Sequence, residues 1–318
     1  MTVRILTGDC RDVLATLPAE SVHCCVTSPP YFGLRDYGCV GQIGLESTYQ
    51  DFVAQMVAVF REVRRVLRAD GTLWLNLGDT YAGGGNGGSG SFEHHRANWR
   101  QVPARSGQRN SVSGLKPKDL CGIPWRVAFA LQADGWWLRQ DIIWSKPNPM
   151  PESVTDRCTK AHEYVFLLSK SERYYFDQKA IAEPAVKAGQ VLHSHDTGAK
   201  DRQDVSDTND RRTRIGLANW DQAQPDTRNK RSVWDVTTAP FAKAHFATFP
   251  PALIEPCILA GCPKGGVVLD PFFGAGTTGL VADRLQRDCI GIELNPAYAD
   301  MARKRIIGDA PLFVDAAE

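Results

Sequence analysis

The sequence predicts an α/β fold built on a doubly wound, mostly parallel sheet with one irregular insertion. Three observations support this prediction. Short apolar runs alternate with amphipathic helical segments in both the N-terminal and the C-terminal parts of the chain. A glycine-rich loop at 270–278 joins an apolar run to a helical segment, an arrangement with which open parallel sheets bind ligands. Between these parts, at 180–236, apolar periodicity fades and acidic residues alternate with basic ones.

Composition narrows the class of protein. The 318 residues suffice for one large α/β domain with insertions or for two small domains. No apolar stretch is long enough to span a bilayer and no signal peptide is recognisable, so we expect no membrane association. The nine cysteines lack zinc-like spacing, so we expect no metal site and reduced thiols in a cytoplasm. The formal net charge is +1, so any nucleic-acid binding must use local charge.

The N-terminal third alternates between strands and helices. Residues 4–7 form a short strand that ends in a glycine-aspartate turn, and 12–17 fit a short helix stopped by a proline. The apolar run 22–26 is a buried strand. Residues 49–67 carry apolar side chains at helical spacing, a glycine stops them, and 71–78 form the next buried strand. A right-handed parallel crossover therefore joins the second strand to the third.

The pattern continues beyond a basic loop. A helix at 123–133 has a proline in its first turn, and strands follow at 136–144 and 163–169. The C-terminal part then contains helices at 251–262, from 277 and at 298–305, and strands at 267–270 and 289–294. We divide the chain into 1–179, 180–236 and 237–318, and the first and last of these form the halves of one domain.

A proline corner follows the strand 22–26. Proline lacks an N–H, so the backbone after Ser28 cannot continue a sheet ladder. The Ser28 hydroxyl and the carbonyls beside Pro29 and Pro30 are acceptors aimed at one point, next to the Tyr31 ring. A planar base with an exocyclic NH2 suits this corner, because the amine donates to the acceptors and the ring stacks on the tyrosine. The alternative is an ordinary Pro-Pro-Tyr turn.

The glycine loop predicts a nucleoside site. Small residues let the backbone approach a ligand, and the helix N-terminus offers free N–H groups. Glu293 follows the glycines by roughly twenty residues and is placed to accept both hydroxyls of a ribose. No Walker lysine follows Gly276, which argues against nucleoside triphosphates. A carboxylate at Asp270 repels a pyrophosphate but suits a cationic ligand such as a sulfonium amino acid.

These two motifs carry a resemblance to a known family. The loop 270–278, Asp-Pro-Phe-Phe-Gly-Ala-Gly-Thr-Thr, is similar to the S-adenosylmethionine-binding motif of DNA amino-methyltransferases, and 27–31, Thr-Ser-Pro-Pro-Tyr, resembles their catalytic motif. The catalytic motif comes first, as in the permuted β class. The resemblance spans 5–305 and is weakest in the insertion. It implies a Rossmann-like class I methyltransferase fold, S-adenosyl-L-methionine as cofactor, double-stranded DNA as substrate and a flipped target base. It also implies that 180–236 recognises the target.

The resemblance assigns roles to residues. Ser28, Pro29, Pro30 and Tyr31 hold the flipped base. Asp9 contacts the adenine amino group of the cofactor, although an N-cap role for this residue stands beside that assignment. The residues implied in cofactor binding are Asp9, His245, Phe246, Phe249, Pro250, Asp270, Phe272, Gly274, Gly276, Thr277, Thr278, Glu293 and Asn295. Arg157 with His162-Glu163 resembles a further motif of the family, to which we assign no role.

Basic side chains gather in two segments that we expect to bind DNA. The loop 82–118 is rich in glycine and then basic, and no acid interrupts it between 96 and 118. A segment whose charges are all positive and that also contains an aromatic residue is expected to become ordered when it binds phosphates. The alternative is a solvated basic loop. The candidate DNA-binding residues are Arg96, Arg100, Arg105, Arg109, Lys116 and Lys118 in the loop, with Arg211, Arg212 and Arg214 in the insertion.

Several alternatives remain at this point. In the family, serine at the first catalytic position is typical of cytosine-N4 enzymes and an acid there is typical of adenine-N6 enzymes. The sequence therefore favours cytosine-N4, with adenine-N6 as the alternative. A non-catalytic nucleic-acid-binding module and an RNA or small-molecule methyltransferase are further alternatives, against which the two intact motifs argue. The family also implies a homodimer, either a cognate restriction endonuclease or none (an orphan enzyme), and a bacterial or phage cytoplasm.

Overall fold

The computed structural model describes residues 2–83, 114–186, 226–238 and 249–309. The chain divides into two compact units. One unit comprises Met1–Asp177 and Ser232–Glu318, and the other comprises Gln178–Arg231. Within the described residues, no helix combines the length and the apolar character that crossing a membrane requires.

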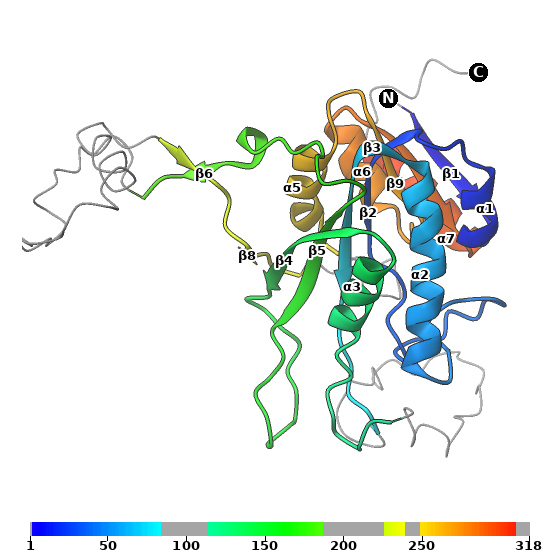
Figure 1. Cartoon of the computed structure of the whole chain (residues 1–318), viewed down its shortest axis with the longest axis vertical. Helices are drawn as coiled ribbons and strands as arrows, with labels where there is room; N and C mark the ends of the chain where they lie inside the picture. The colour runs from blue at the N-terminus through cyan, green and yellow to red at the C-terminus, as the bar shows by residue number, and fades with distance from the viewer. Residues whose placement is uncertain (1, 84–113, 187–225, 239–248, 310–318) are drawn as a thin grey trace, which may run out of the picture. The chain divides into compact units, whose positions relative to one another are not determined.

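An eight-stranded sheet forms the centre of the first unit, in the order β1-β10-β9-β2-β3-β5-β4-β8 (Figure 1). The strands are β1 (Val3–Thr7), β2 (Val22–Thr27), β3 (Leu67–Leu77), β4 (Trp137–Ser145), β5 (His162–Ser169), β8 (Val233–Asp235), β9 (Val267–Asp270) and β10 (Asp288–Glu293). Only β5 runs antiparallel to its two neighbours, β3 and β4, and the other five neighbouring pairs are parallel. The prediction of a mostly parallel sheet is confirmed.

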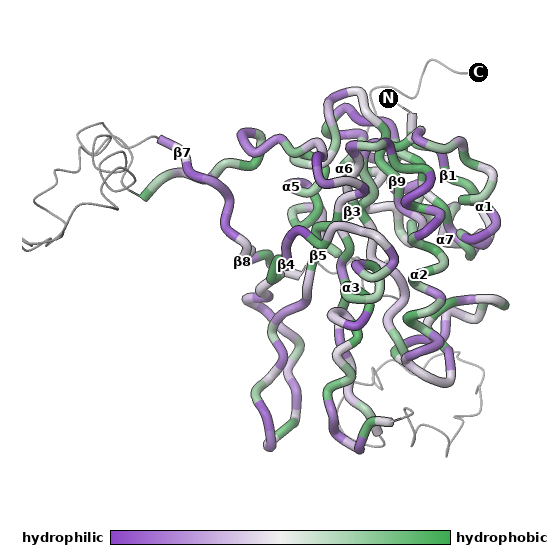
Figure 2. Tube along the Cα trace, in the orientation of Figure 1, coloured by the Kyte–Doolittle hydropathy of each residue, from purple (hydrophilic) through white to green (hydrophobic). Residues whose placement is uncertain are grey.

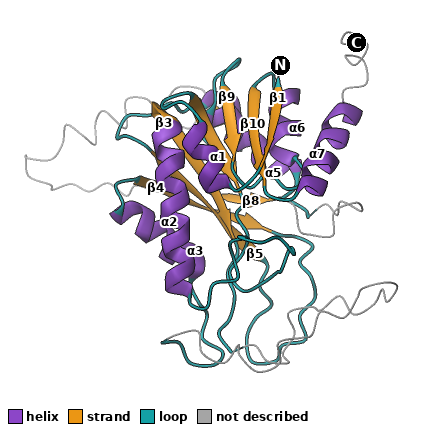
Figure 3. Cartoon of the chain, turned by 90° about the vertical axis from the view of Figure 1, so that its right-hand side faces the viewer, coloured by secondary structure: helices purple, strands orange, loops and turns teal. Residues whose placement is uncertain are grey.

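Helices cover both faces of this sheet (Figure 3). The described helices of the unit are α1 (Cys10–Thr16), α2 (Tyr49–Val66), α3 (Ile123–Ala133), α5 (Pro251–Gly261), α6 (Thr277–Arg284) and α7 (Pro296–Asp309). One group of helices consists of α1, α2 and α3, in which α2 packs between the other two. The second group consists of α5, α6 and α7, in which α6 packs between the other two. The strand β2 connects to its parallel neighbour β3 through α2, as the sequence predicts.

The helix α2 shows why the N-terminal elements form where they do. Thr48 caps it, because its hydroxyl accepts from the Asp51 N–H at 3.1 Å. One face buries Phe52, Met56 and Phe60 completely. Such burial is worth about 1.5–3 kcal/mol for each large apolar side chain. Apolar residues also follow the central strands (Figure 2), so the main core lies between the sheet and the helix layer that includes α2.

The third strand begins earlier than expected. The sequence predicts a break at Gly71, yet β3 starts at Leu67 and continues through that glycine. Leu67 is extended and already pairs with Val22 on β2. A Cβ at Gly71 would lie 3.0 Å from the Arg68 carbonyl oxygen, so the glycine permits tight backbone packing inside the strand.

The predicted insertion contributes to both units. Its C-terminal residues form β8, which pairs in parallel with β4 at the edge of the sheet. The second unit has a 3-10 turn, η1 (Lys179–Ile181), and a two-stranded antiparallel ladder of β6 (Glu183–Pro184) and β7 (Thr227–Arg228). Within it, the Glu183 carboxylate lies 3.4 Å to 3.6 Å from the cationic groups of Arg228, Lys230 and Arg231.

Candidate active site

The two motifs lie at the ends of neighbouring strands. The strands β2 and β9 pair in parallel, so the proline corner after Thr27 and the glycine loop after Asp270 emerge at the same edge of the sheet (Figure 1). The Thr27 hydroxyl donates to Asp270 Oδ1 at 2.6 Å. Ser28 is half-buried and Pro29 is buried at this junction. The structure therefore brings together the two motifs that sequence reasoning singled out.

Asp270 is the buried centre of this junction. Its Oδ1 accepts from Thr27 and from the Phe272 N–H at 3.0 Å, and its Oδ2 accepts from the Thr278 hydroxyl at 2.6 Å. Burial raises the pKa of this carboxyl to about 6, and the two hydroxyl donors oppose that shift. The carboxylate thus connects β2, the glycine loop and α6. Its predicted role beside a cofactor cation stays a prediction.

The proline corner is connected to the other half of the sheet through Tyr31. Its hydroxyl donates to Glu163 Oε2 at 2.6 Å and lies 3.2 Å from Asn76 Oδ1. Burial, followed by the charge of Glu163, raises the pKa of Tyr31 well above its usual value. Sequence reasoning noticed Glu163 only as part of a motif without a role, and it missed Asn76.

The part of the site that the sequence predicts to bind a nucleoside is built around Glu293. Its Oε2 accepts from the Gly274 N–H at 2.7 Å and its Oε1 accepts from the Asn295 N–H at 2.8 Å. Burial raises the pKa of this carboxyl. Because β10 pairs with β1, Glu293 faces Thr7 across the ladder and lies close to the turn that contains Asp9. Each carboxylate oxygen of Glu293 keeps lone-pair capacity for a further donor such as a ribose hydroxyl.

Asp9 has the N-cap role that the sequence allows. Its Oδ1 accepts from the Arg11 N–H at 2.9 Å, and the Arg11 guanidinium also binds the carboxylate. The hydrogen bond from the Arg11 side chain is the main cause that lowers the pKa of Asp9. The same guanidinium donates to the Gly41 carbonyl at 3.0 Å. The predicted contact of Asp9 with an adenine amino group stays a prediction.

The backbone conformation and close packing of the glycine loop require small residues, in addition to any requirement of a ligand. Gly274 and Gly276 have φ values of 52° and 75°, which favour glycine. A Cβ at Gly276 would lie only 2.8 Å from Ala302 Cβ on α7. Thr277 is buried and its hydroxyl oxygen accepts from Arg305 at 2.9 Å. These contacts place the N-terminus of α6, with its free N–H groups, at the site.

Other predicted residues lie at the border of the described region. Phe272 is half-buried against the core, Phe249 is half-buried, and Pro250 immediately precedes α5. His245 and Phe246 lie outside the described residues.

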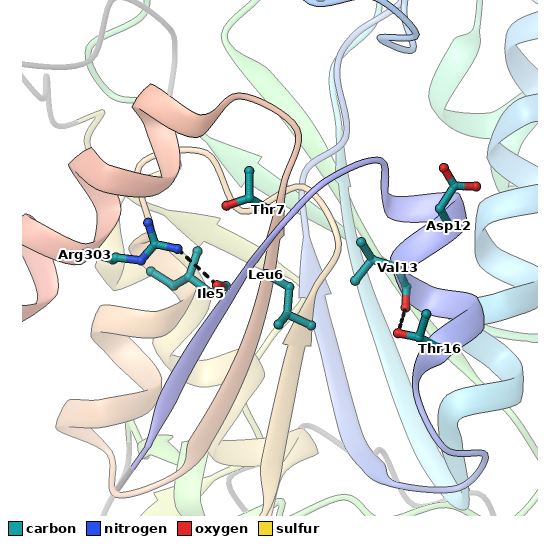
Figure 4. Close-up of a pocket in the computed structure, with 7 residues that line it drawn as sticks. All are labelled: Ile5, Leu6, Thr7, Asp12, Val13, Thr16 and Arg303. Carbon is teal, nitrogen blue, oxygen red and sulfur yellow. Dashed lines mark hydrogen bonds between the residues drawn. The ribbon is translucent and has the colours of Figure 1, made fainter.

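A separate pocket of about 430 Å³ opens at the edge strand β1, between α1 and α7 (Figure 4). None of the predicted site residues lines it, so it is not part of this site.

Two of the predicted DNA-binding residues can be placed. Lys116 and Lys118 are both exposed, and their ammonium groups lie 3.6 Å from Asp119 and 2.6 Å from Asp156. The other predicted residues lie outside the described part of the chain; they are Arg96, Arg100, Arg105, Arg109, Arg211, Arg212 and Arg214.

Across the described ranges, no group of three or more His, Cys, Asp or Glu side chains could hold a metal ion.

Comparison with known proteins identifies the family. A family model described as DNA methylase matches residues 22–304. The chain belongs to this DNA methylase family. Two relatives are the Type II methyltransferases M.SmaI of Serratia marcescens and M.XycI of Xanthomonas campestris pv. cyanopsidis. The first is 46% identical and covers 96% of this chain and 90% of the relative. The second is 49% identical, with coverages of 95% and 86%.

Solved structures agree with the fold of this DNA methyltransferase. A putative DNA modification methylase from Thermus thermophilus, complexed with S-adenosyl-L-methionine, matches with a TM-score of 0.59 and 26% identity, and 98% of each chain is covered. The cytosine-N4-specific PvuII DNA methyltransferase matches with a TM-score of 0.63 and 19% identity, covering 98% of this chain and 92% of that one. The predictions of the family and of a class I methyltransferase fold are confirmed.

The enzyme is an S-adenosyl-L-methionine-dependent DNA methyltransferase. The described residues fit this cofactor, because the half-buried acceptors of Glu293 and Asp9 lie at the same sheet edge as the N-terminus of α6. When bound, the cofactor supplies an electrophilic methyl group on a sulfonium. Glu293 would hold the ribose hydroxyls and the loop around Gly274 would hold the methionine part.

Proposed function

We propose that this enzyme methylates the N4 amino group of cytosine in double-stranded DNA. The observation that carries the proposal is the geometry of Ser28 at the head of the proline corner. Its half-buried hydroxyl follows Thr27, which donates to Asp270 Oδ1 at 2.6 Å, so the corner lies beside the start of the glycine loop. The hydroxyl oxygen of Ser28 can accept a hydrogen from an amine.

The corner activates an amine that is a poor nucleophile. The lone pair of a nucleobase NH2 is delocalised into the ring. Acceptors at Ser28 and at the Pro29 carbonyl draw the amine towards tetrahedral geometry and localise the lone pair, while the Tyr31 ring stacks on the base. Because the base must leave the duplex first, base flipping costs a few kcal/mol. No covalent intermediate with the enzyme is needed.

Nucleoside analysis separates the target bases. Unmethylated phage lambda DNA is incubated with the enzyme and tritiated S-adenosyl-L-methionine, and the digested nucleosides are identified by mass spectrometry. N4-methylcytosine is the expected product. N6-methyladenine as the product would contradict the choice of cytosine and would show that the same corner acts on adenine. Absence of tritium from the DNA would overturn the proposal.

We further propose a restriction-modification setting and a homodimer. The Type II names of the relatives support the first, and the family resemblance supports the second. Plasmid isolated from a host that expresses the enzyme should resist an endonuclease of the same sequence specificity, and analytical ultracentrifugation should give twice the chain mass. Full cleavage of that plasmid would contradict the restriction-modification setting. A measured mass equal to that of one chain would contradict the homodimer.

A further inference from the structure

Arg11 lies in the first turn of α1 and joins three separate segments of the chain. Its Nε donates to Asp9 Oδ1 at 2.9 Å, and its Nη2 donates to Asp9 Oδ2. Its Nη1 donates to Gln55 Oε1 on α2 at 3.0 Å, and Nη2 also donates to the Gly41 carbonyl at 3.0 Å. The guanidinium is therefore held between a carboxylate, a neighbouring helix and a loop.

Gly41 belongs to a loop that begins at the proline corner. The Gly33 N–H donates to the Gly44 carbonyl at 2.8 Å, which closes the segment between them into a compact loop. A Cβ at Gly44 would lie 3.2 Å from the Tyr31 carbonyl oxygen, so the end of the loop packs on the corner. A Cβ at Gly41 would lie 3.6 Å from Asp9 Oδ2. One short loop thus lies beside both the corner and the Asp9 carboxylate.

Asp9 lies next to the residue that we expect to bind the ribose of the cofactor. The Gly8 N–H donates to the Glu293 carbonyl at 2.9 Å, so the turn that contains Asp9 is bonded to the end of β10. A ribose held by Glu293 brings the attached adenine towards this turn. The lowered pKa of Asp9 keeps its carboxyl ionised at neutral pH, and an ionised carboxylate only accepts hydrogen bonds. The exocyclic amine of adenine supplies a matching donor.

Arg11 decides which acceptor position of Asp9 stays open. Asp9 Oδ1 accepts from the Arg11 N–H and from its Nε, each at 2.9 Å, and these two bonds use both of its lone pairs. Among the described residues, Oδ2 accepts from Nη2 alone, so one of its lone pairs remains for a further donor. Gly41 lies beside this oxygen and has no side chain to cover it. The two-pronged bond from the guanidinium also prevents rotation of the carboxylate.

We propose that Arg11 is a positioning residue, which fixes the Asp9 carboxylate so that its Oδ2 accepts a hydrogen from the exocyclic amine of the cofactor's adenine. Arg11 does not itself touch the cofactor and acts through Asp9. The inference rests on the adenine contact that the family resemblance implies for Asp9, and it holds whichever base of the DNA is methylated. Because the same guanidinium binds Gly41, the loop beside the proline corner is tied to the adenine end of the cofactor site.

Calorimetry with two cofactor analogues tests the inference. S-adenosyl-L-homocysteine carries the adenine amine, whereas S-inosyl-L-homocysteine carries a carbonyl in its place. The wild type should bind the adenosyl compound about 10- to 100-fold more tightly, because the carbonyl meets Asp9 Oδ2 with a lone pair. Arg11→Met removes the guanidinium, so this ratio of affinities should fall at least about fivefold. The ratio compares two ligands on one protein, so a change in the folded fraction cancels.

Arg65 provides a matched control. Its side chain is 35% exposed, against 37% for Arg11, and it binds the Glu62 carboxylate at 2.7 Å. It also donates to the carbonyls of Leu14 at 2.7 Å and Leu17 at 2.9 Å. Arg65→Met should therefore lower the thermal transition as Arg11→Met does, and it should leave the ratio of affinities at the wild-type value.

Two further variants separate positioning from charge and from direct contact. Arg11→Lys keeps the charge but lacks the planar fork that binds both carboxylate oxygens, so its ratio should fall as in Arg11→Met. Asp9→Ala removes the acceptor and should bring the ratio close to one. Adding Arg11→Met to Asp9→Ala should change the ratio no further, because Arg11 acts through Asp9.

Several results would overturn the inference. These are a wild-type ratio in Arg11→Met, in Arg11→Lys or in Asp9→Ala, an equal fall in Arg65→Met, and a further fall when Arg11→Met is added to Asp9→Ala. A wild-type protein that binds the two analogues equally would remove Asp9 from the adenine site, and this inference with it. Methyl transfer to DNA by the wild type is measured separately and decides the proposed function independently of these ratios.

Discussion

The hydroxyl of Thr27 donates a hydrogen bond of 2.6 Å to the carboxylate of Asp270, although 243 positions separate the two residues. Both side chains are almost completely buried. Thr27 directly precedes the proline corner, and Asp270 opens the glycine loop. The contact therefore fixes the distance between the residues that we propose bind the base and those that we propose bind the cofactor, and methyl transfer requires this distance to be closely set.

Removal of this contact should weaken both stability and catalysis. Thr27→Val keeps the volume of the side chain and deletes the donor, so the free energy of unfolding should fall by about 1–2 kcal/mol. Turnover should fall further than this loss of folded protein explains, because the corner and the loop are no longer joined. Urea unfolding and methyl-transfer rates measure the two effects.

A second buried threonine provides the control for that variant. Thr72 on β3 is fully buried and bonds to Cys24 and to Trp74 rather than to the site. Thr72→Val should lower stability and leave the kcat of the folded enzyme unchanged. Equal losses of kcat in the two variants would show that the link to Asp270 has no special part in catalysis.

The raised pKa of Asp270 should appear in the pH dependence of stability. Burial raises this pKa from 3.8 to about 6, so the folded protein binds the proton more tightly than the unfolded chain does. The contribution of Asp270 is therefore fully present below about pH 4 and is lost as the pH rises through about 6, by up to about 3 kcal/mol.

Asp270→Asn removes the titration and isolates this contribution. The free energy of unfolding of the wild type minus that of the variant should fall between about pH 4 and 6 and then level off. Urea unfolding at several pH values measures the difference. A difference that stays constant, or that grows with pH, would show that burial does not dominate the environment of this carboxyl.

Gly78 should prove essential for the placement of Tyr31. A Cβ at Gly78 would lie 2.4 Å from a ring carbon of Tyr31, so Gly78→Ala should push the ring away from the base. We expect kcat to fall about 100-fold or more with an unchanged affinity for the cofactor. Gly308→Ala is the matched control, since nothing lies within 4 Å of its Cβ, and it should leave the rate unchanged. A fully active Gly78→Ala enzyme would refute this account of the ring.

Glu293 should control affinity for the cofactor. Glu293→Gln keeps an acceptor for one of the two N–H groups that the carboxylate binds, but it loses charge and acceptor capacity for the ribose. Calorimetry should show S-adenosyl-L-methionine binding about 10- to 100-fold more weakly. Glu255→Gln on α5 is the control and should bind like the wild type. Unchanged affinity in Glu293→Gln would remove this residue from the ribose site.

Basic residues of the loop 82–118 should account for part of the salt dependence of DNA binding. Charge reversal at Arg105 and Arg109 should lower the slope of log K against log salt by about 0.9 for each lost phosphate contact. Asp156→Asn should strengthen DNA binding, because it releases Lys118 from its ion pair. An unchanged slope in the reversal variant would mean that the loop does not contact DNA.

Much of the fold follows from local patterns in the sequence. The apolar spacing of α2, the alternation of short strands and the proline corner depend on neighbouring residues, and each was predicted close to its observed place. The break expected at Gly71 was wrong, since the pairing of Leu67 with β2 overrides the local signal of a glycine. The antiparallel course of β5 was not predicted, because strand direction depends on which neighbours a strand joins.

The sequence alone determined the two motifs and their order and predicted the chemistry of each, because side-chain type and local spacing carry that information. Only the tertiary structure decided which distant residues complete them. Thr27 meets Asp270, and Tyr31 meets Glu163, because the order of the strands in the sheet joins residues 243 and 132 positions apart. No local pattern encodes such a contact, since it depends on the packing of the whole sheet.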